Sequence, residues 1–539
     1  MRKTTASFLR ICVRPSDLAG DWSVVEKRKY FLLRSNKGQI LLQKWQPYPV
    51  TFAQKKSFGV LFGYIDPNCL GVINTVSNYK ELRHEIGRLR QQSAEFLIGV
   101  IRPHSSSFEL YRDVHCNLPL FFYHKRAVFL ADNHFENIVT HPEFKVEINE
   151  PILGAFLAGI TYYTNETVFS HLKILTERSA LALKPTSRVS LRLPRSAQPT
   201  RTRRRSNLAS FAKVLGKTVR KRSQAVTKFA KVGVELSGGL DSSTVAGIVS
   251  TNLQNPLQCY SIEFLGDGAT TLRRKLLRLV ERFPLKSHLV KLGNRYPLIK
   301  QAKVMRPKFY KSEIYENIIA KLAQMAKAHG VEVIFTGIGG DELFSIDQGE
   351  RNNFRGEAYL SKAASKPLPA FCTEKCPQAV QELATSPTPF PLPLLPHSVH
   401  GAHLATNNIF ILKGVWPIAP LAEPKLVRYC RGLPKEYRFK KEILRRYQAT
   451  KNYPVEVFRP VVNENFQQIF DEAFNVKAAD FLRKLFERSI LGRLGWLDKQ
   501  KLVREYEAIR KGTSMLDPFM LYRVAAIEII LQSLEKSNP

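Results

Sequence analysis

The chain has 539 residues, of which 44% are hydrophobic and 10% aromatic, and its 82 Lys and Arg against 46 Asp and Glu give a formal net charge of +36. This length and composition predict a packed globular protein of about two to four domains, and no apolar run reaches the roughly 18 residues of a membrane-spanning helix. Arg10 and Arg14 interrupt any signal-peptide core, and seven scattered cysteines form no disulfide framework, so we expect a reduced, cytoplasmic protein.

Residues 1–190 are expected to form the first domain, because short alternating segments typical of β-strands recur along it. These segments are Lys29–Arg34, Gln39–Gln43, Ser57–Phe62, Glu95–Ile101, Phe108–Arg112 and Ala127–Ala131. The most informative stretch is LYRDVHCNLPLFFY, at Leu110–Tyr123, which the strand-like VFLADN follows at Val128–Asn133.

Residues 191–231 are predicted to be a basic linker, because no acidic residue occurs between Arg178 and Val234. Its basic residues include Arg195, Arg201, Arg203, Arg204, Arg205, Lys213, Lys217, Arg220, Lys221, Arg222, Lys228 and Lys231. Like charges at this density repel, so we expect an exposed arm or a basic helix from about Leu208. Such a segment either holds an acidic partner or is a solvated linker. No aromatic ladder for base stacking accompanies it, which argues against nucleic acid.

The strongest signal lies at Val232–Ser250, VGVELSGGLDSSTVAGIVS. Its first residues are typical of a short buried strand, and its last apolar residues recur at helical spacing. A strand, a glycine-rich turn and a helix bring free backbone N–H groups and the helix dipole to one point. That arrangement predicts an anion site.

The SGGLDSS turn supplies the groups that such a site needs. Gly238 and Gly239 let the backbone approach a phosphate closely. Ser237, Ser242 and Ser243 offer hydroxyl donors. No Lys follows the second glycine, so the motif is not a Walker loop.

A second motif of the same form, VEVIFTGIGGDELF, lies at Val331–Phe344. An apolar strand at Val333–Phe335 leads into a glycine turn that carries the acidic pair Asp341 and Glu342. Two strand-end loops meet at the carboxyl edge of a parallel sheet, where α/β folds bind ligands. Asp241 and Asp341 are therefore predicted to share a magnesium ion, which takes carboxylate and phosphate oxygens together.

These two motifs resemble the asparagine synthetase family of ATP pyrophosphatases, in which SGGxDS grips pyrophosphate and the GxGGDE aspartate completes the metal site. The resemblance implies a doubly wound parallel-sheet (HUP-like) domain at 232–345, with ATP and Mg²⁺ as cofactors. It implies cleavage of ATP between the α- and β-phosphates, formation of an adenylate from a carboxylate, and attack by an amine. It also assigns Gly339 and Gly340 to the pyrophosphate site, and the backbone of Ser261 and Ile262 to adenine recognition.

The N-terminal stretch is similar to the RDxxGxxPLYY segment of the glutaminase domain that precedes the synthetase in this family. The similarity rests mainly on Arg112, Asp113, Pro119, Leu120 and Tyr123. It implies an Ntn-type αββα sandwich for residues 1–190. Such a glutaminase uses a cysteine at position 2 as its nucleophile, whereas this chain has Arg2. We therefore expect a glutaminase-like fold without glutamine hydrolysis.

After the second loop, residues 346–404 are predicted to be a proline-rich loop or insertion. Eight prolines within Lys366–Pro396 argue against regular structure there, and the segment is either a plain insertion or a lid facing the substrate. Residues 405–539 are expected to be the helical remainder of the synthetase domain.

Two helical stretches, PLAEPKLVRYCRGLP and KKEILRR, resemble family segments. In the following loop the family places a lysine that steadies charge developing on the α-phosphate, but Val461 and Val462 stand there. Arg459, Lys440 or Lys441 are candidates to replace this cation, because a preorganised positive charge is a major electrostatic contribution.

The missing nucleophile, the altered lysine loop and the basic charge resemble specialised relatives, notably the lasso-peptide cyclases. There a side-chain Asp or Glu is adenylated and captured by the N-terminal amine of the peptide. The predicted function is an AMP-forming carbon–nitrogen ligase acting on a small-molecule or peptide carboxylate. Three alternatives stay open: an asparagine synthetase using ammonia, a non-catalytic descendant that binds peptide or nucleotide, and a tRNA-modifying ATP pyrophosphatase. The last ordinarily carries neither this N-terminal domain nor the GGDELF loop.

Overall fold

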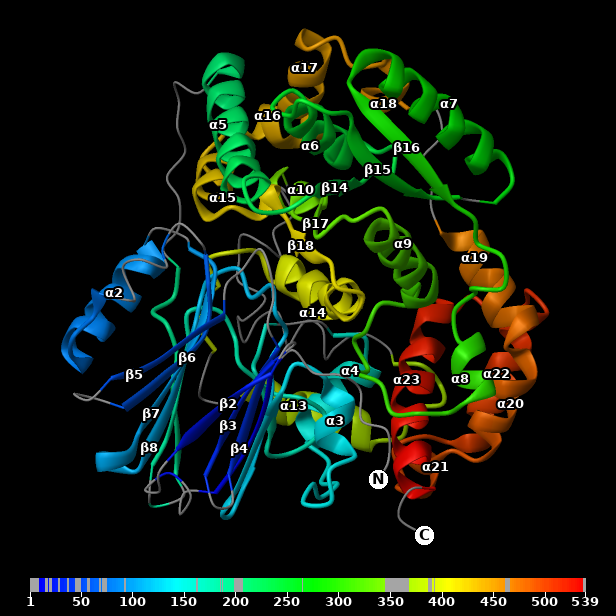
Figure 1. Cartoon of the computed structure of the whole chain (residues 1–539). Coiled ribbons are helices and arrows are strands. Elements are labelled where there is room, and N and C mark those ends of the chain that lie inside the picture. Colours follow the sequence, from blue (N-terminus) through cyan, green and yellow to red (C-terminus); the bar gives the residue numbers. More distant parts are fainter. Residues whose placement is uncertain are drawn as a thin grey trace.

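The computed structural model contains two antiparallel sheets, a parallel sheet covered by helices, and a C-terminal group of helices (Figure 1). It describes residues 9–14, 18, 22–27, 30–35, 38–43, 50–55, 59–66, 69, 75–91, 94–160, 163–184, 186, 188–197, 207–263, 265–344, 368–385, 390–391, 393–460 and 466–536.

The N-terminal part is a sandwich of the two antiparallel sheets. The seven-stranded sheet has the order β11 (Leu172–Ile174), β9 (Phe121–Lys125), β10 (Val128–Asp132), β1 (Leu9–Val13), β4 (Gln39–Gln43), β3 (Tyr30–Arg34) and β2 (Ser23–Glu26). The six-stranded sheet has the order β13 (Val189–Arg192), β12 (Ala180–Leu183), β8 (Ser107–Arg112), β7 (Phe96–Arg102), β6 (Gly59–Ile65) and β5 (Val50–Lys55). The six strands expected from alternating segments are confirmed to within a few residues.

The two sheets bury a common core. Alternate residues of β1 are buried, as the strand period of two requires, and they share one apolar cluster with Phe62 and Phe108 of the other sheet. The rings of Phe108 and Phe129 join the sheets at 5.8 Å. Helix α2 (Tyr79–Gln91) packs on the outer face of the six-stranded sheet. Helices α3 (Phe135–Val139) and α4 (Glu150–Leu157) pack beside the seven-stranded one.

All pairs of the third sheet are parallel, and its strand order places the site. The order is β16 (Leu285–Val290), β15 (Leu257–Ile262), β14 (Val232–Glu235), β17 (Val333–Phe335) and β18 (Trp416–Ile418). The chain runs outward from β14 through β15 and β16 and then crosses to β17, so the direction of winding reverses beside β14. Ligands bind at the carboxyl ends of strands at such a switch point.

Helices cover both faces of the parallel sheet. The elements are α5 (Leu208–Thr227), α6 (Leu240–Ser250), α7 (Asp267–Arg282), α9 (Glu316–Ala328), α10 (Gly340–Phe344), α14 (His397–Leu412), α15 (Pro424–Arg431) and α17 (Glu442–Thr450). Residues of α5, α6 and α7 share one apolar cluster with β14, and residues of α9 and α14 share another with β15 and β16.

Helix α5 corrects the prediction that the whole of 191–231 is a linker. It begins at Leu208, as expected, but Phe211, Leu215, Val219 and Val226 are buried against the core. Four apolar residues on one helical face are enough to anchor a helix whose opposite face is basic. The second half of the segment therefore belongs to the parallel-sheet domain.

Two further expectations for the C-terminal half were wrong. Residues Lys375–Thr385 form helix α13 within the proline-rich segment, because Pro377 falls in the first turn, where its missing N–H costs no hydrogen bond. Strand β18 interrupts the region expected to be helical. Three residues are too few to show a strand period, and Pro417 obscures the pattern.

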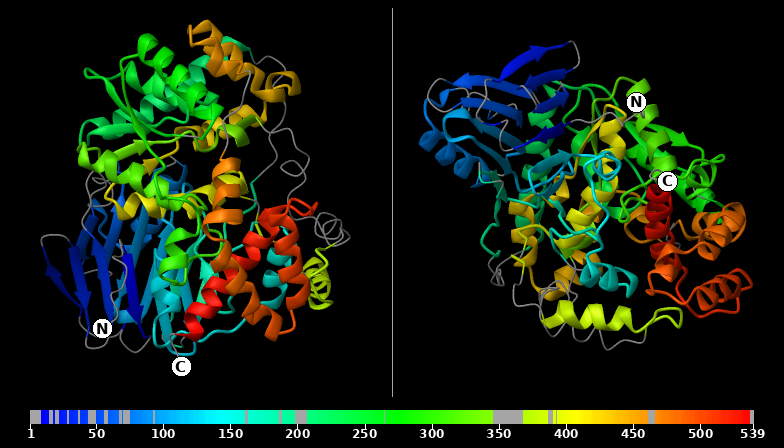
Figure 2. Two further views of the ribbon diagram at one scale, coloured as in Figure 1. Left: turned by 90° about the vertical axis from the view of Figure 1, so that its right-hand side faces the viewer. Right: turned by 90° about the horizontal axis from the view of Figure 1, so that it is seen from below.

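The C-terminal helices are α19 (Gln467–Glu472), α20 (Ala479–Glu487), α21 (Ile490–Arg493), α22 (Lys499–Arg510) and α23 (Pro518–Glu535) (Figure 2). They share one apolar cluster with α3, α4, α13 and strands β9 and β10 of the seven-stranded sheet. Among the described helices, none combines the length and the apolar character needed to cross a membrane.

Candidate active site at the edge of the parallel sheet

The two glycine loops are in direct contact, because their strands β14 and β17 are neighbours. A Cβ atom on Gly340 would lie 2.2 Å from Cγ of Asp241, and one on Gly337 would lie 2.8 Å from the backbone N of Ser242. Both distances are shorter than real side chains permit. The loops therefore require glycine at these positions to bring the two motifs together.

The first loop is organised by its own serines. The Ser237 N–H donates to Ser242 Oγ at 3.2 Å, and the two hydroxyl oxygens lie 3.0 Å apart. The Gly239 N–H donates to Ser237 Oγ at 3.3 Å, and Gly238 has a φ of 75° that favours glycine. Helix α6 begins at once and leaves its first N–H groups without intrahelical acceptors. The loop therefore presents hydroxyls and a helix N-terminus, as an oxyanion site requires.

The ammonium of Lys441 lies between the two predicted metal ligands. Its Nζ is 2.5 Å from Oδ2 of Asp241 and 2.5 Å from Oδ1 of Asp341. The backbone there is unusual, since Lys440 and Lys441 have φ values of 47° and 57°. Two successive non-glycine residues in the left-handed region are strained, and such strain gathers at functional sites. The turn thus aims one lysine at both carboxylates.

Helix α17 holds this turn in place. Arg445 donates from Nε to the Lys440 carbonyl at 2.9 Å. Gln448 is fully buried and donates from Nε2 to Leu240 O and to Thr244 Oγ1, both at 2.8 Å. Because Leu240 and Thr244 belong to α6, these bonds fix the lysine turn relative to the first loop.

Charge and burial oppose one another at this cluster. Burial raises the pKa of Asp241, and the Lys441 ammonium opposes that rise. Burial lowers the pKa of Lys441, but the two aspartates outweigh it and raise the pKa overall. The side chain of Asp341 is 87% exposed, against 17% for Asp241. One carboxylate is therefore fixed in the wall and the other faces solvent.

The carboxylates also fit the predicted divalent cation. They converge on a single positive charge, and Oδ1 of Asp241 is buried without a hydrogen-bond partner in the described part of the chain. Carboxylate oxygens are the ligands that Mg²⁺ accepts alongside phosphates. The donor set and the orphaned oxygen are both consistent with a Mg²⁺ ion held by Asp241 and Asp341.

A cavity of about 310 Å³ adjoins the first loop at Ser237. Its lining residues are Glu235, Leu236, Ser237, Tyr260, Ile262, Glu313, Tyr315, Ile319, Leu322, Ile338, Thr406, Phe410 and Phe466. The walls are mostly apolar and aromatic. Burial, with a smaller effect from Glu313, raises the pKa of Glu235 to about 7. This explains the acidic residue in an otherwise apolar strand: it faces the cavity.

The remaining predicted site residues have different surroundings, and they do not all line the cavity. Ile262 lines the cavity, whereas the Ser261 hydroxyl donates to Leu236 O at 2.5 Å and so supports the first loop. Gly339 has a φ of 95°, and a Cβ there would lie 2.9 Å from Ala422 N. Lys440 Nζ lies over the Phe439 ring at 5.6 Å. Arg459 is exposed at the end of a short helix.

Of the three cation candidates, the structure therefore places Lys441 at the two aspartates. Val461 and Val462, the nucleophile position Arg2 and the arginines of 201–205 lie outside the described residues. The sequence reasoning missed Arg445 and Gln448. Arg445 and Gln448 are three residues apart in α17 and so share one helical face, next to the lysine turn, which was a usable signal.

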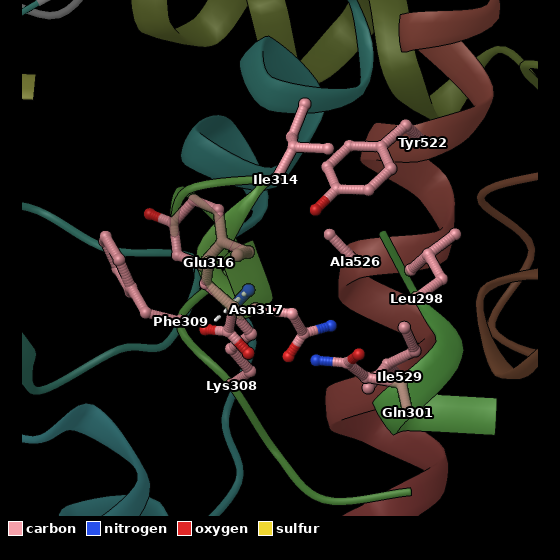
Figure 3. A pocket seen from close by; sticks show the side chains of 11 residues that line it. Leu298, Gln301, Lys308, Phe309, Ile314, Glu316, Asn317, Tyr522, Ala526 and Ile529 are labelled. Atoms are coloured by element: carbon pink, nitrogen blue, oxygen red, sulfur yellow. Dashed lines mark ion pairs between the residues drawn. The ribbon is translucent and has the colours of Figure 1, made fainter. Parts of the chain in front are cut away.

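A second cavity, shown in Figure 3, lies away from the loops between the 298–317 segment and α23. Its volume is only about 20 Å³, and the Lys308–Glu316 ion pair at 2.9 Å lies in its wall. Because a single water needs about 10–15 Å³, this space does not accommodate a substrate.

The asparagine synthase family model matches residues 210–382, a range that contains both glycine loops. The match supports an ATP-dependent ligase-type enzyme of the asparagine synthetase family. It begins within α5 and ends before Lys441. None of the curated proteins compared with the chain matches it.

Several solved structures are similar to this chain, but only distantly. The U34-tRNA thiolase NcsA from Methanococcus maripaludis with its 4Fe–4S cluster is 14% identical, with a TM-score of 0.25, over 60% of this chain and 90% of its own. Glutamine phosphoribosylpyrophosphate amidotransferase from B. subtilis, complexed with ADP and GMP, is 10% identical, with a TM-score of 0.22, over 57% and 78%. TM-scores this low support no argument about fold or function.

Proposed function

We propose that this protein adenylates a carboxylate with ATP and transfers the acyl group to an amine, releasing pyrophosphate and AMP. The observation that carries the proposal is the convergence of Asp241, Asp341 and Lys441 beside the SGGLDSS loop. An anion loop next to a shared cation site is what the cleavage of a nucleotide at its α-phosphate requires.

The loop and the lysine have complementary roles in the first step. Ser237, Ser242 and the start of α6 hold the leaving pyrophosphate while a carboxylate oxygen attacks the α-phosphorus and the bond to the β-phosphate oxygen breaks. Lys441 supplies a positive charge beside the reacting phosphate, and its ammonium would leave its place between Asp241 and Asp341 when Mg²⁺ binds there. Asp241 and Asp341 would hold Mg²⁺, which supplies charge neutralisation for the phosphate oxygens.

The cavity beside Ser237 provides for the second step. Its apolar side at Ile262 suits the adenosine group, and its acidic side suits an amine. The amine nitrogen attacks the acyl carbon, AMP leaves, and Glu235 accepts the amine proton. A carboxylate with a pKa of about 7 is suited to take a proton at neutral pH.

We propose a specialised substrate, as in a lasso-peptide cyclase, because Val461 and Val462 stand where the family has a lysine and the chain is strongly basic. The N-terminal sandwich is then a glutaminase-like domain without glutamine hydrolysis. An asparagine synthetase that uses free ammonia is the second candidate, because it needs the same loops and differs in the substrate cavity. The exposed residues Lys213, Lys217 and Lys221 on α5 provide a surface for an acidic partner such as a precursor peptide.

Carboxylate-dependent exchange of labelled pyrophosphate into ATP tests the proposal. The assay compares aspartate, glutamate and any short peptide encoded beside the gene. Exchange that requires a peptide supports the cyclase-like function, and exchange with aspartate alone supports asparagine synthesis. Nucleotide binding without exchange for any carboxylate would leave the non-catalytic alternative in place.

A further inference from the structure

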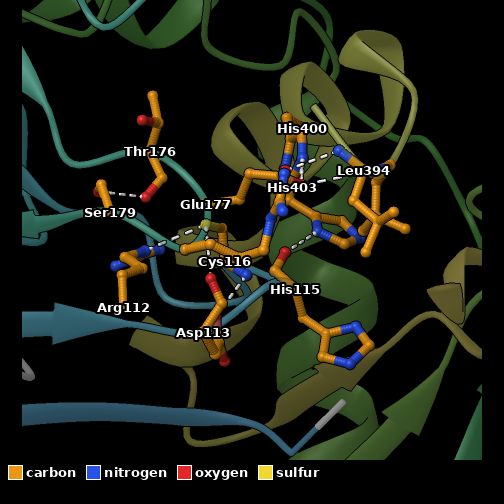
Figure 4. Close-up of polar contacts among 12 residues, drawn as sticks. Arg112, Asp113, His115, Cys116, Thr176, Glu177, Ser179, Leu394, His400 and His403 are labelled. Atoms are coloured by element: carbon orange, nitrogen blue, oxygen red, sulfur yellow. Dashed lines mark hydrogen bonds and ion pairs between the residues drawn. The ribbon is translucent and has the colours of Figure 1, made fainter. Parts of the chain in front are cut away.

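A third cavity lies where the N-terminal sandwich meets helix α14, away from the nucleotide loops. It has a volume of about 110 Å³ and lies between the β8–β9 loop, the turn at residues 174–177 and the first turns of α14 (Figure 4). We propose that this cavity is a binding site for a small carboxylate, separate from the site of adenylation.

One cationic side chain in the wall of the cavity, Arg112, has a nitrogen without a hydrogen-bond acceptor in the described part of the chain. Arg112 is 1% exposed, and its Nε contacts Cys116 Sγ at 3.1 Å while one terminal nitrogen donates to Leu118 O. The other terminal nitrogen, Nη1, is buried without a hydrogen-bond partner among the described residues. Leaving a charged donor unpaired in the interior costs on the order of 1–3 kcal/mol or more. An anion in the cavity would supply the missing acceptor.

A second cation, Lys311, lines the same cavity and is half-buried. Burial, with a smaller effect from Arg523, lowers the pKa of Lys311 to about 8. The lysine is therefore still mostly protonated at neutral pH, and a bound anion would favour its charged form.

The acidic groups nearby are already satisfied. Glu177 accepts from His400 Nε2 at 2.8 Å, from the Leu394 N–H at 2.6 Å and from Arg178 Nη2 at 2.8 Å. Burial would raise the pKa of Glu177, but these bonds outweigh it and lower the pKa overall. Asp113, behind Arg112, is buried and accepts from two backbone N–H groups, at 2.8 and 2.9 Å. The unbalanced charge at the cavity is therefore positive.

The size and the remaining lining specify the class of anion. Pro119, Leu120 and Leu404 give the cavity apolar walls, and the hydroxyls of Tyr163 and Thr176 also line it. By the measure used for the second cavity, in which one water needs about 10–15 Å³, a volume of about 110 Å³ holds several waters. A short-chain carboxylic acid fits this combination, with its carboxylate toward Arg112 and Lys311 and its alkyl group against the apolar wall.

Binding of propionate to the full-length protein tests the proposal without ATP. Isothermal titration and ligand-observed NMR compare propionate with propionamide, which has the same shape but no charge. We expect propionate to bind at least about 10-fold more tightly, a difference of about 1.4 kcal/mol. Equal affinity for propionate and propionamide would overturn the proposal. A protein that binds inorganic phosphate but not propionate would overturn it as well.

Substitutions of Lys311 locate the site. Lys311→Met is expected to weaken propionate binding about 10-fold, and Lys311→Gln by a similar factor, while Lys311→Arg retains it. Lys303→Met, which removes an exposed lysine from the preceding helix, serves as the matched control and leaves binding unchanged. The assignment would be overturned if folded Lys311→Met protein bound propionate as tightly as the wild type. It would also be overturned if the wild type bound no propionate at concentrations up to about 50 mM.

Discussion

Lys441 Nζ lies 2.5 Å from Oδ2 of Asp241, although the two residues are 200 positions apart in the sequence. The contact depends on two consecutive residues with positive φ, each of which costs roughly 1–2 kcal/mol for a residue with a Cβ atom. The surrounding bonds from α17 stabilise this conformation. We infer that the chain retains the strained turn because it delivers the ammonium to the aspartates.

The first prediction concerns this lysine. Lys441→Met should reduce pyrophosphate exchange by about 100-fold or more, because it removes the positive charge that the turn places beside the pyrophosphate loop. Lys440→Met is the matched control, since the neighbouring side chain lies over Phe439 and does not contact the aspartates. Equal exchange rates in the two variants would remove Lys441 from the mechanism.

The second prediction concerns the contact between the loops. Gly340→Ala places a Cβ atom 2.2 Å from Asp241 Cγ, so the two loops must separate. Pyrophosphate exchange should then fall by about 10-fold or more, because a misplacement of reacting groups by about 1 Å can lower the rate by about 100-fold. Gly87→Ala in α2 is the control, because nothing lies within 4 Å of its new methyl group. That variant should retain activity and gain about 1 kcal/mol of stability. Full activity in Gly340→Ala would show that the loops do not act as one site.

The third prediction concerns the junction between the sandwich and the parallel-sheet domain. Arg222 pairs with Glu95 and lies 3.1 Å from Glu423, and all three are buried. Arg222→Met leaves Glu95 buried without this partner and should lower the free energy of unfolding by about 3–5 kcal/mol. Chemical denaturation measures the change. Lys221→Met, on the exposed face of the same helix, should stay within about 0.5 kcal/mol of wild type, and a similar small change for Arg222→Met would contradict the account.

The fourth prediction concerns the pH dependence of stability. The pKa of Glu235 is about 7 in the folded protein, above its ordinary value in an unfolded chain of about 4.3. Between these values the folded state binds the extra proton, so this group makes stability fall as pH rises and then level off above about pH 7.

Glu235→Gln removes that contribution. The variant should gain stability relative to wild type as pH rises from about 4.3 to 7 and keep a constant advantage at higher pH. Urea unfolding across this range measures the difference, with Glu281→Gln, an exposed carboxylate on α7, as the control. Parallel stability profiles for wild type and Glu235→Gln would show that the carboxyl is not perturbed.

The nucleotide loops were predictable from the sequence because their information is local. A strand, glycines and a helix within some twenty residues specify the SGGLDSS turn, and strand adjacency follows from the parallel fold. The convergence of Asp241 and Asp341 on Lys441 was not predictable in detail. It depends on Gly337 and Gly340 allowing two loops from distant segments to touch.

The choice of Lys441 among three cations also needed the structure. Neighbouring lysines have the same chemistry, and only the left-handed turn directs one to the site and the other to Phe439. Proline composition alone does not predict helix α13, because the helix depends on the position of Pro377 in its first turn. The basic residues of helix α5 conceal its buried apolar face in the sequence.

The most direct test of the central claim is carboxylate-dependent exchange of labelled pyrophosphate into ATP by Asp241→Asn and Asp341→Asn proteins. Each substitution removes one of the two charges that share the cation, so each should reduce exchange by about 100-fold or more. Folding of the variants is checked by circular dichroism. Loss of exchange in both, with folding retained, is the predicted result; wild-type exchange in either variant would contradict the assignment of this edge of the sheet as the adenylation site.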